Sequence, residues 1–245
     1  MGKGKLKKFT EMKGFDHVIQ APFHVLQDND FHLKGKWAQE FFQNDNPVVL
    51  ELGCGKGEYT LELASMNANL NYIGVDIKGA RLWKGAKLAL ERDLKNVAFL
   101  RTNIEVIARF FGPHEVDEIW LTFPDPQMKK TRKRLTSKTF LEKYRQFLKP
   151  EGVIHLKCDS NFQFTYTREL VKLNKFEVLA ETENLYEWEG LNNILRIRTF
   201  YEKQWLDRGI KIKYLAFKLH EGEYLEPNIE IEKDEYRSFG RSARE

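Results

Sequence analysis

The fold of this chain is decided by the stretch Glu51-Leu52-Gly53-Cys54-Gly55-Lys56-Gly57. Before it, Pro47–Leu50 is a short apolar run typical of a buried strand, and after it Glu58–Ala64 has the composition of a helix. A strand, a glycine turn and a helix in this order open a nucleotide-binding α/β unit. Glycine has no Cβ, so the backbone can turn tightly here and approach a ligand closely.

The spacing of the glycines indicates which ligand the turn binds. A dinucleotide fingerprint has its third glycine three residues after the second, where a pyrophosphate lies at the helix N-terminus. Glu58 stands at that position here, and the third glycine comes one residue earlier. The acid-x-Gly-x-Gly-x-Gly pattern of Glu51, Gly53, Gly55 and Gly57 resembles motif I of the S-adenosylmethionine-dependent methyltransferases. An acidic strand end suits that cationic cofactor, and the alternative is a glycine-rich turn without a ligand.

Length and composition limit the class of protein. The chain has 245 residues and an apolar fraction of 42%, which is enough for one sizeable globular domain. It has no apolar run near the roughly 20 residues that span a bilayer, and Met1–Lys8 does not lead into a secretory signal, so we expect no membrane partner. Two cysteines, Cys54 and Cys158, cannot build a disulfide framework, which favours the reducing cytoplasm. The six histidines are scattered, so we predict no metal site.

The charges are unevenly placed, although the formal net charge is only +4. The first 13 residues carry five lysines and one glutamate, a second basic block spans Lys129–Arg134, and residues 221–245 form a tail that leans acidic. Clustered cations on a nearly balanced protein suggest a polyanion surface, with nucleic acid as the first candidate. The alternative is a solvated basic face.

Strands and helices alternate along the chain. We predict strands at 47–50, 71–76, 97–100, 116–123, 153–158, 176–180 and 213–219. Helical patterns fall at 58–64, 80–94, 104–111, 140–147, 162–170 and 199–208, and residues 1–40 read as a basic arm followed by a helix with Trp37, Phe41 and Phe42 on one side. This rhythm predicts a doubly wound, mostly parallel α/β sheet of seven strands in a single domain spanning 1–245. Seven strands in this order match the Rossmann-like class I methyltransferase fold.

Polar residues stand where the second and third predicted strands end. In open α/β sheets, ligands bind beyond the carboxyl ends of the strands. Asp76 lies 19 residues after Gly57, where a carboxylate can accept hydrogen bonds from both ribose hydroxyls of a nucleoside; a loop cap is the alternative. The amide of Asn103 can contact an adenine edge, or Asn103 can be the N-cap of the helix that begins at Ile104.

The fourth predicted strand ends in Phe123-Pro124-Asp125-Pro126-Gln127. Two prolines restrict the backbone on both sides of Asp125, so this carboxylate is held where the methyl group and its acceptor should meet. Followed by a lysine- and arginine-rich run and preceded by the glycine motif, this loop closely resembles that of the bacterial tRNA (guanine-N(7)-)-methyltransferases, and the likeness runs from about residue 48 to 219. A purely structural turn is the alternative.

The resemblance assigns roles to individual residues. It implies that S-adenosylmethionine is contacted by Glu51, Asp76, Asn103 and Asp125, and that the substrate is contacted by Lys129, Asp159, Thr199, Phe200, Tyr201 and Glu202. Thr199 and Glu202 also form a helix capping-box pattern, and Asp159 can instead cap the following helix. The chain departs from the family at three places. Gln127 stands where tryptophan is usual, and Cys158 stands where threonine is common. The basic run consists almost wholly of lysine and arginine, whereas the family more often has histidines within it.

The function implied is tRNA modification, with a methyl group passing from S-adenosylmethionine to guanine N7 in the variable loop. N7 carries an in-plane lone pair, so no general base has to remove a proton from it. Catalysis then needs alignment of the reactants and a carboxylate that stabilises the developing positive charge, and we expect Asp125 to be this carboxylate. With Lys129, the cations Lys130, Arg132, Lys133 and Arg134 are expected to hold phosphates, and Tyr201 to receive a flipped base. The alternatives are a methyltransferase for another substrate, a non-catalytic RNA-binding protein and, with the wrong glycine spacing, a nicotinamide oxidoreductase. Monomer and homodimer both remain open.

Overall fold

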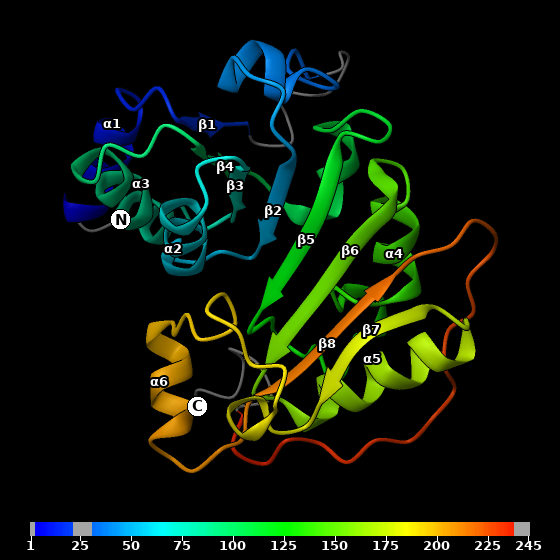
Figure 1. Ribbon diagram of the computed structural model, residues 1–245. Coiled ribbons are helices and arrows are strands. Elements are labelled where there is room, and N and C mark those ends of the chain that lie inside the picture. The colour runs from blue at the N-terminus through cyan, green and yellow to red at the C-terminus, as the bar shows by residue number, and fades with distance from the viewer. Residues whose placement is uncertain (1–2, 22–30, 238–245) are drawn as a thin grey trace.

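The computed structural model describes residues 3–21 and 31–237 (Figure 1). Its centre is a sheet of eight strands in the order β1-β4-β3-β2-β5-β6-β8-β7, in which all neighbours from β1 to β6 are parallel. The doubly wound α/β class is therefore confirmed. The count of seven strands is wrong by one, because a short strand, β1, joins the edge of the sheet.

The parallel strands are buried because helices cover both faces of the sheet. They are β2 (Val48–Leu52), β3 (Asn71–Val75), β4 (Val97–Arg101), β5 (Val116–Thr122) and β6 (Leu148–Cys158). β8 (Lys213–Lys218) runs antiparallel between β6 and β7 (Glu177–Thr182). The chain leaves β2 on one side toward β3 and β4 and returns on the other side to β5, so the switch point of the sheet lies between β2 and β5.

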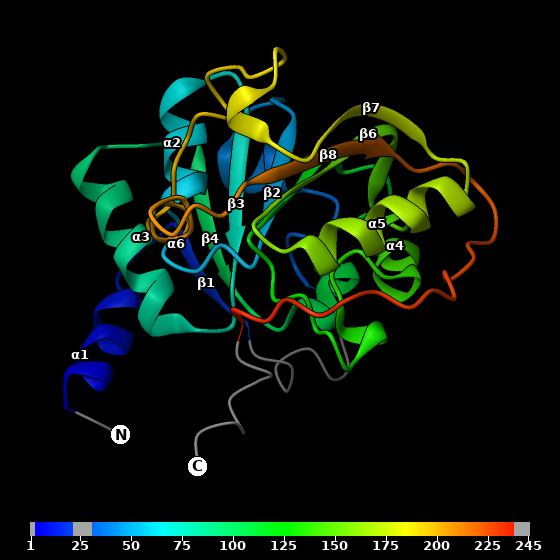
Figure 2. The same cartoon turned by 90° about the horizontal axis from the view of Figure 1, so that it is seen from below.

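The helices form two layers, as Figures 1 and 2 show. One face of the sheet carries α2 (Glu58–Met66), α3 (Gly79–Glu91) and α6 (Phe200–Leu206), with their apolar residues in one core cluster. The other face carries α4 (Lys138–Tyr144), α5 (Asn161–Leu173), the π-helix η2 (Trp37–Phe42) and the 3₁₀ helix η3 (Ile104–Arg109). Short 3₁₀ turns, η4 (Thr131–Lys133) and η5 (Leu185–Glu187), lie in the connecting loops.

The N-terminal region differs from the expected basic arm. Residues Lys3–Met12 form a helix, α1, that packs on α3; Met12 is buried, and the indole N–H of Trp83 donates to Glu11 at 2.7 Å. After it, β1 (Val18–Gln20) pairs with β4. Three residues are too few to show an alternating pattern, which is why the sequence did not predict this strand.

The predicted end of the fourth long helix also differs. α4 ends at Tyr144 rather than at Phe147, and Pro150 lies inside β6. The register between β5 and β6 jumps from Leu148 to Val153, so the intervening residues bulge out of the ladder. A bulge is one of the few places in a sheet where proline can stand, because its missing N–H leaves no gap in the pairing.

The described part of the C-terminal tail, residues 219–237, runs along α5 (Figure 2). Asn174 exchanges hydrogen bonds with the backbone of Leu225, at 2.9 and 2.6 Å, and the hydroxyl of Tyr166 donates to Glu226. The tail is thus attached to the domain up to Arg237. None of the helices in the described ranges is long and apolar enough to cross a membrane.

Candidate active site

The ends of four neighbouring strands meet around one cavity of about 340 Å³. Its lining includes Gly53 after β2, Asp76 after β3, Asn103 after β4 and Asp125 after β5. Small-molecule sites typically have volumes of about 300–1,000 Å³. The structure therefore brings together four of the residues predicted to bind the cofactor, at the switch point of the sheet.

The glycine loop has the conformation that its sequence implies. Gly53, Gly55 and Gly57 all have positive φ angles, of 85°, 58° and 69°. At Gly57 a Cβ atom would also lie 2.6 Å from the ring of Phe99, so this residue must be glycine for packing as well as for conformation. The loop therefore keeps its backbone close to the cavity without side chains that would fill it.

Asp76 ties this loop to β3. One carboxylate oxygen accepts a hydrogen bond from the backbone N–H of Gly55 at 2.9 Å, and the other accepts from that of Lys78 at 2.6 Å. Each carboxylate oxygen can accept a second bond. Asp76 can thus bind a ligand hydroxyl from the cavity while it holds the loop in shape.

Glu51 lies beneath the loop rather than in the lining of the cavity. Its carboxylate accepts hydrogen bonds from the backbone N–H of Thr60 at 2.9 Å and from the hydroxyls of Thr60 and Thr122. Burial raises the pKa of Glu51 to about 7, although these hydrogen bonds favour the ionised form. The residue braces β2 against α2 and β5, and its predicted contact with the cofactor stays a prediction.

Asn103 combines its two proposed roles. Its side-chain oxygen accepts from the backbone N–H of Glu105 at 3.0 Å, so Asn103 is the N-cap of η3, as one alternative predicted. The same residue lines the cavity. Capping fixes the side chain, which leaves its amide group at a defined place on the cavity wall.

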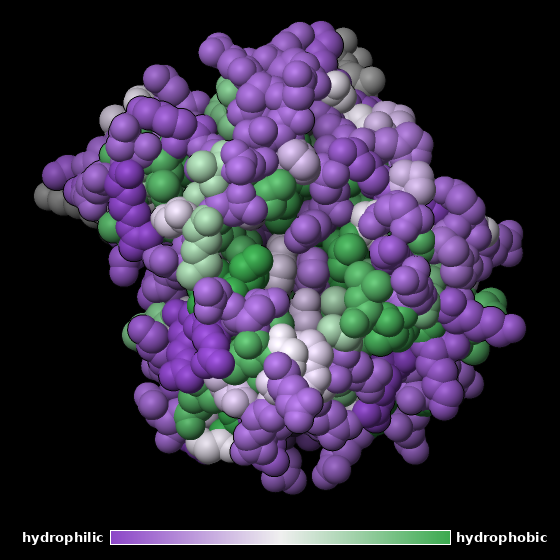
Figure 3. Space-filling model, in the orientation of Figure 1, coloured by the Kyte–Doolittle hydropathy of each residue, from purple (hydrophilic) through white to green (hydrophobic). Residues whose placement is uncertain are grey.

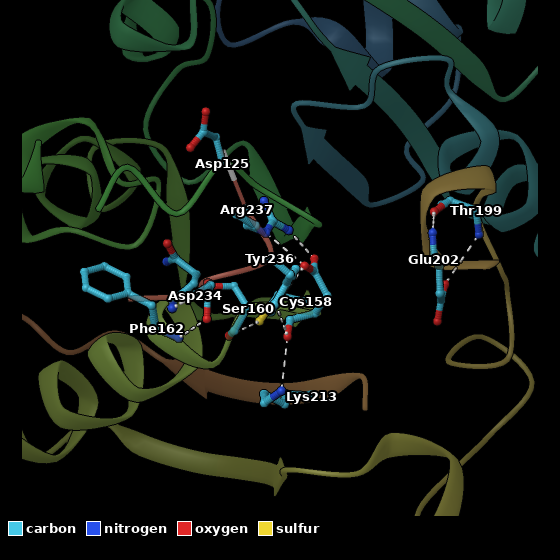
Figure 4. Close-up of polar contacts among 12 residues, drawn as sticks. Asp125, Cys158, Ser160, Phe162, Thr199, Glu202, Lys213, Asp234, Tyr236 and Arg237 are labelled. Atoms are coloured by element: carbon cyan, nitrogen blue, oxygen red, sulfur yellow. Dashed lines mark hydrogen bonds and ion pairs between the residues drawn. The ribbon is translucent and has the colours of Figure 1, made fainter. Parts of the chain in front are cut away.

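Asp125 stands in a strained loop. Phe123 and Gln127 have φ angles of 51° and 47°, a region that residues with a side chain rarely adopt. One oxygen of Asp125 accepts from the backbone N–H of Gln127 at 3.0 Å, and the side chain is exposed. In Figure 4 this carboxylate stands apart from the hydrogen-bonded groups around it. Strain of this kind persists where the surrounding structure enforces it, which is common at functional sites.

The basic block is not uniformly exposed. Lys129, Lys130 and Arg132 lie on the surface, and Lys133 lines the cavity and pairs with Glu105 at 3.4 Å. Arg134 is buried, with its guanidinium 4.7 Å from the ring centre of Phe162 and 4.4 Å from that of Tyr166. Burial lowers the pKa of Arg134. Arg134 therefore braces the loop and does not present its guanidinium to solvent.

Asp159 follows β6 and is completely buried under the C-terminal tail. Arg237 contacts both carboxylate oxygens, with its Nε 2.9 Å from Oδ2, and the hydroxyl of Tyr236 donates to the same oxygen at 3.2 Å. The residue that caps α5 is Ser160, whose hydroxyl accepts from Gln163 N–H at 2.9 Å. The alternative that Asp159 caps this helix is therefore wrong.

The Thr199–Glu202 motif divides into a buried and an exposed half. The capping box is confirmed, because Thr199 accepts from the Glu202 N–H and Glu202 accepts from the Thr199 N–H. Glu202 is completely buried and lies 2.9 Å from the ammonium of Lys157. Phe200 and Tyr201 are 46% and 39% exposed, so the motif presents these two rings to solvent.

Several supporting residues were missed from the sequence. Thr60 and Thr122 hold Glu51, Lys157 holds Glu202, and Arg237 covers Asp159. Of these residues, only Lys157 could have been singled out from the sequence, because it is a cation within the apolar run 153–158. Within 3–21 and 31–237, no three His, Cys, Asp or Glu side chains are grouped so that they could hold a metal ion.

Comparisons with known proteins agree with this arrangement. A family model described as "Putative methyltransferase" matches residues 45–215. Two solved structures, of an antibiotic-related methyltransferase and of a 16S rRNA (adenine(1408)-N(1))-methyltransferase from Catenulisporales acidiphilia, share the fold with TM-scores of 0.55 and 0.53, at 20% and 13% identity. Each covers 74% of this chain, over 92% and 90% of its own length, and at such identities the likeness concerns the fold alone.

Curated relatives are much more similar. The tRNA (guanine-N(7)-)-methyltransferase of Bacteroides thetaiotaomicron is 57% identical over 100% of this chain and 97% of its own length. That of Porphyromonas gingivalis is 56% identical over 95% of this chain and 98% of its own length. The chain therefore belongs to the tRNA (guanine-N(7)-)-methyltransferase family.

Proposed function

We propose that this protein methylates N7 of a guanine in the variable loop of tRNA, with S-adenosylmethionine as the methyl donor. The observation that carries the proposal is the cavity at the switch point of the sheet, where Gly53, Asp76 and Asn103 share one lining with Asp125. The first three belong to the part of the fold that binds nucleosides, and Asp125 comes from the loop that is specific to this family.

The residues around the cavity fit this cofactor. Asp76 has acceptor capacity for the two ribose hydroxyls, and the amide of Asn103 can both donate to and accept from an adenine edge. Asp76 and Asp125 add negative charge near a group that carries a sulfonium. When bound, S-adenosylmethionine supplies an electrophilic methyl group.

The protein's part in the reaction is to position the base and stabilise charge. Guanine N7 is already a nucleophile, so no side chain has to remove a proton. Asp125 holds the base near the cavity and stabilises the positive charge that develops on the methylated ring. Its strained loop keeps the carboxylate in place before the substrate arrives, which reduces the reorganisation needed during the reaction.

Asp159 is proposed to bind the Watson–Crick edge of the target guanine. In the structure, the guanidinium of Arg237 presents a pair of N–H donors to this carboxylate. The N1–H and N2–H groups of guanine form a similar pair of donors. The base can therefore take the place of Arg237 on Asp159, which requires the end of the tail to move away.

The cations that follow Asp125 position the tRNA. Lys129, Lys130, Arg132 and Lys133 are exposed in the segment that follows Asp125, and Lys133 lines the cavity, so these cations can neutralise phosphates and place the target nucleotide. We assign Arg134 to bracing the loop instead, because it is buried between Phe162 and Tyr166. Phe200 and Tyr201 are available to stack on a base.

The substitution Asp125→Ala tests the assignment of the acceptor site. We expect kcat for methyl transfer to an unmodified tRNA transcript to fall by about 100-fold or more, because an electrostatic contact to the developing charge is lost. Asp125→Asn, which keeps the shape and removes the charge, should be similarly impaired. Because Asp125 also lines the donor cavity, the Kd for S-adenosylmethionine is measured in parallel and kcat is taken at saturating donor, which separates a loss of donor binding from a loss of catalysis. Near-normal turnover in both variants would remove Asp125 from the mechanism.

A further inference from the structure

A second and larger hollow lies along α2 and shares no lining residue with the methyl-donor cavity. It has a volume of about 1,020 Å³ and runs between α2, the end of α3, residues 193–198 and the start of α6. Figure 3 shows strongly hydrophilic side chains over this part of the surface, between α2 and α6. We call it the α2–α6 groove. Apart from Phe200, none of its lining residues has a role in the proposed reaction.

The groove carries an excess of positive charge. Its two carboxylates are already occupied, because Glu58 accepts from the Phe200 N–H at 2.9 Å and Glu62 pairs with Arg92 at 2.7 Å. Three further cations, Arg196, Arg198 and Lys203, line the groove and are exposed. In the part of the chain that the structure describes, none of these three forms an ion pair with a carboxylate. Cations that are not neutralised within the protein are available for an anionic partner.

The groove is continuous with the proposed RNA site. Phe200 belongs to its lining, and the ammonium of Lys56, from the glycine loop, lies 4.0 Å from the centre of the Phe200 ring. The guanidinium of Arg81 lies 5.8 Å from the ring centre of Tyr201. Exposed aromatic rings interleaved with cations are typical of surfaces on which bases of single-stranded RNA stack. The two rings therefore connect the groove to the glycine loop and to the start of α3.

The walls of the groove are fixed in place by buried contacts. The Tyr59 hydroxyl of α2 donates to the backbone oxygen of Ile194 at 2.9 Å, and Lys157 donates to the backbone oxygens of Leu195 and Ile197 at 2.9 and 2.7 Å. The same ammonium holds Glu202 in α6. The segment that carries Arg196 and Arg198 is thus attached to the sheet and to α2, which makes the groove a preformed surface.

We propose that the α2–α6 groove binds the sugar–phosphate backbone of the tRNA strand next to the target guanine. The proposal rests on the proposed function and extends the RNA interface beyond the 129–134 block to the opposite side of the methyl-donor cavity. Phe200 and Tyr201 hold a neighbouring base, and Arg196, Arg198 and Lys203 neutralise the phosphates that follow. The target nucleotide is thereby held from both sides, which limits its freedom to slide away from the donor.

Charge reversal in the groove provides the test. In Arg196→Glu/Lys203→Glu, we expect the KM for an unmodified tRNA transcript to rise by at least about fivefold at 150 mM salt, with the KM for S-adenosylmethionine unchanged. The plot of log affinity against log salt, from filter binding, should become less steep by about 1.5, since each lost phosphate contact removes about 0.7–0.9 from the slope. The neutral pair Arg196→Gln/Lys203→Gln should show a smaller change in the same direction.

Lys172→Glu/Lys175→Glu is the matched control, because it changes the net charge equally at the exposed end of α5 and in the turn that follows it, and neither residue lines the groove. We expect its tRNA KM and salt slope to stay near those of the wild type. The inference fails if the groove variants behave like this control. It also fails if the groove variants change only the sedimentation of the protein, because that result would identify the groove as a contact between copies of this chain. If the wild type itself does not methylate tRNA, the proposed function fails instead.

Discussion

Glu51 is the residue whose ionisation is most closely linked to the stability of the glycine loop. Its side chain is buried, and burial raises its pKa to about 7 from 4.5. Below pH 4.5 the carboxyl group is protonated in both the folded and the unfolded chain. Between pH 4.5 and 7 the unfolded chain releases this proton while the folded chain keeps it, so the stability that the raised pKa provides is lost as the pH rises through that window.

The isosteric substitution Glu51→Gln removes this titration. A pKa shift of this size corresponds to about 3 kcal/mol. Between pH 4.5 and 7, the free energy of unfolding of the wild type should therefore fall by about 3 kcal/mol relative to that of the variant. Urea unfolding of both proteins at several pH values measures the difference. Parallel stability curves for the two proteins would show that Glu51 is not protonated in the folded state.

At the level of the helix, α6 depends on an ion pair inside the protein. Lys157 at the end of β6 and Glu202 in α6 are both completely buried. Burial lowers the pKa of Lys157, and the neighbouring Glu202 opposes this shift. Removing one partner of such a pair leaves an uncompensated charge in the interior, whereas removing both does not.

We therefore expect Glu202→Ala to destabilise the protein by about 3–5 kcal/mol. The double variant Lys157→Met/Glu202→Leu should be clearly more stable than Glu202→Ala, because it leaves no isolated charge. Urea unfolding of the wild type, Lys157→Met, Glu202→Leu and the double variant completes a double-mutant cycle, and Glu202→Ala is measured beside it. Additive effects in this cycle would mean that the two side chains do not interact.

The elements differ in how far the sequence predicts them. The glycine turn, the parallel strands and the capping box at Thr199 follow from local patterns, which depend on neighbours in the chain. β1 was not predicted because its three residues are ordered by pairing with β4, a partner distant in sequence. The buried positions of Arg134 and Glu202 depend in the same way on rings and charges from other elements. Resemblance to a family identifies such residues, but it does not show which way they face.

On the scale of the whole molecule, the C-terminal tail closes the fold over the predicted substrate site. Asp234 accepts from the backbone N–H of Phe162 at 3.1 Å and from the hydroxyl of Ser160, which attaches the tail to the start of α5. Beyond this anchor, Tyr236 and Arg237 reach Asp159. The end of the tail can therefore exchange with a ligand of Asp159 while Asp234 keeps the rest in place.

The exchange predicts opposite effects for the two partners of this ion pair. Asp159→Asn should raise the KM for tRNA, because the base loses its acceptor, whereas Arg237→Ala should lower it, because a competing donor is removed. Arg237→Lys retains the charge and should lie between Arg237→Ala and the wild type. Steady-state kinetics with an unmodified tRNA transcript measure all three. Equal increases in KM for Asp159→Asn and Arg237→Ala would identify the pair as purely structural.

Mass mapping of the methylated nucleoside tests the proposed chemistry most directly. The purified protein is incubated with S-adenosylmethionine and an unmodified tRNA transcript, and the RNA is then digested to nucleosides and to mapped fragments. We expect N7-methylguanosine at one guanine of the variable loop. A product methylated at another atom or base, or no product under conditions where S-adenosylmethionine binds, would contradict the assignment of this site to guanine N7.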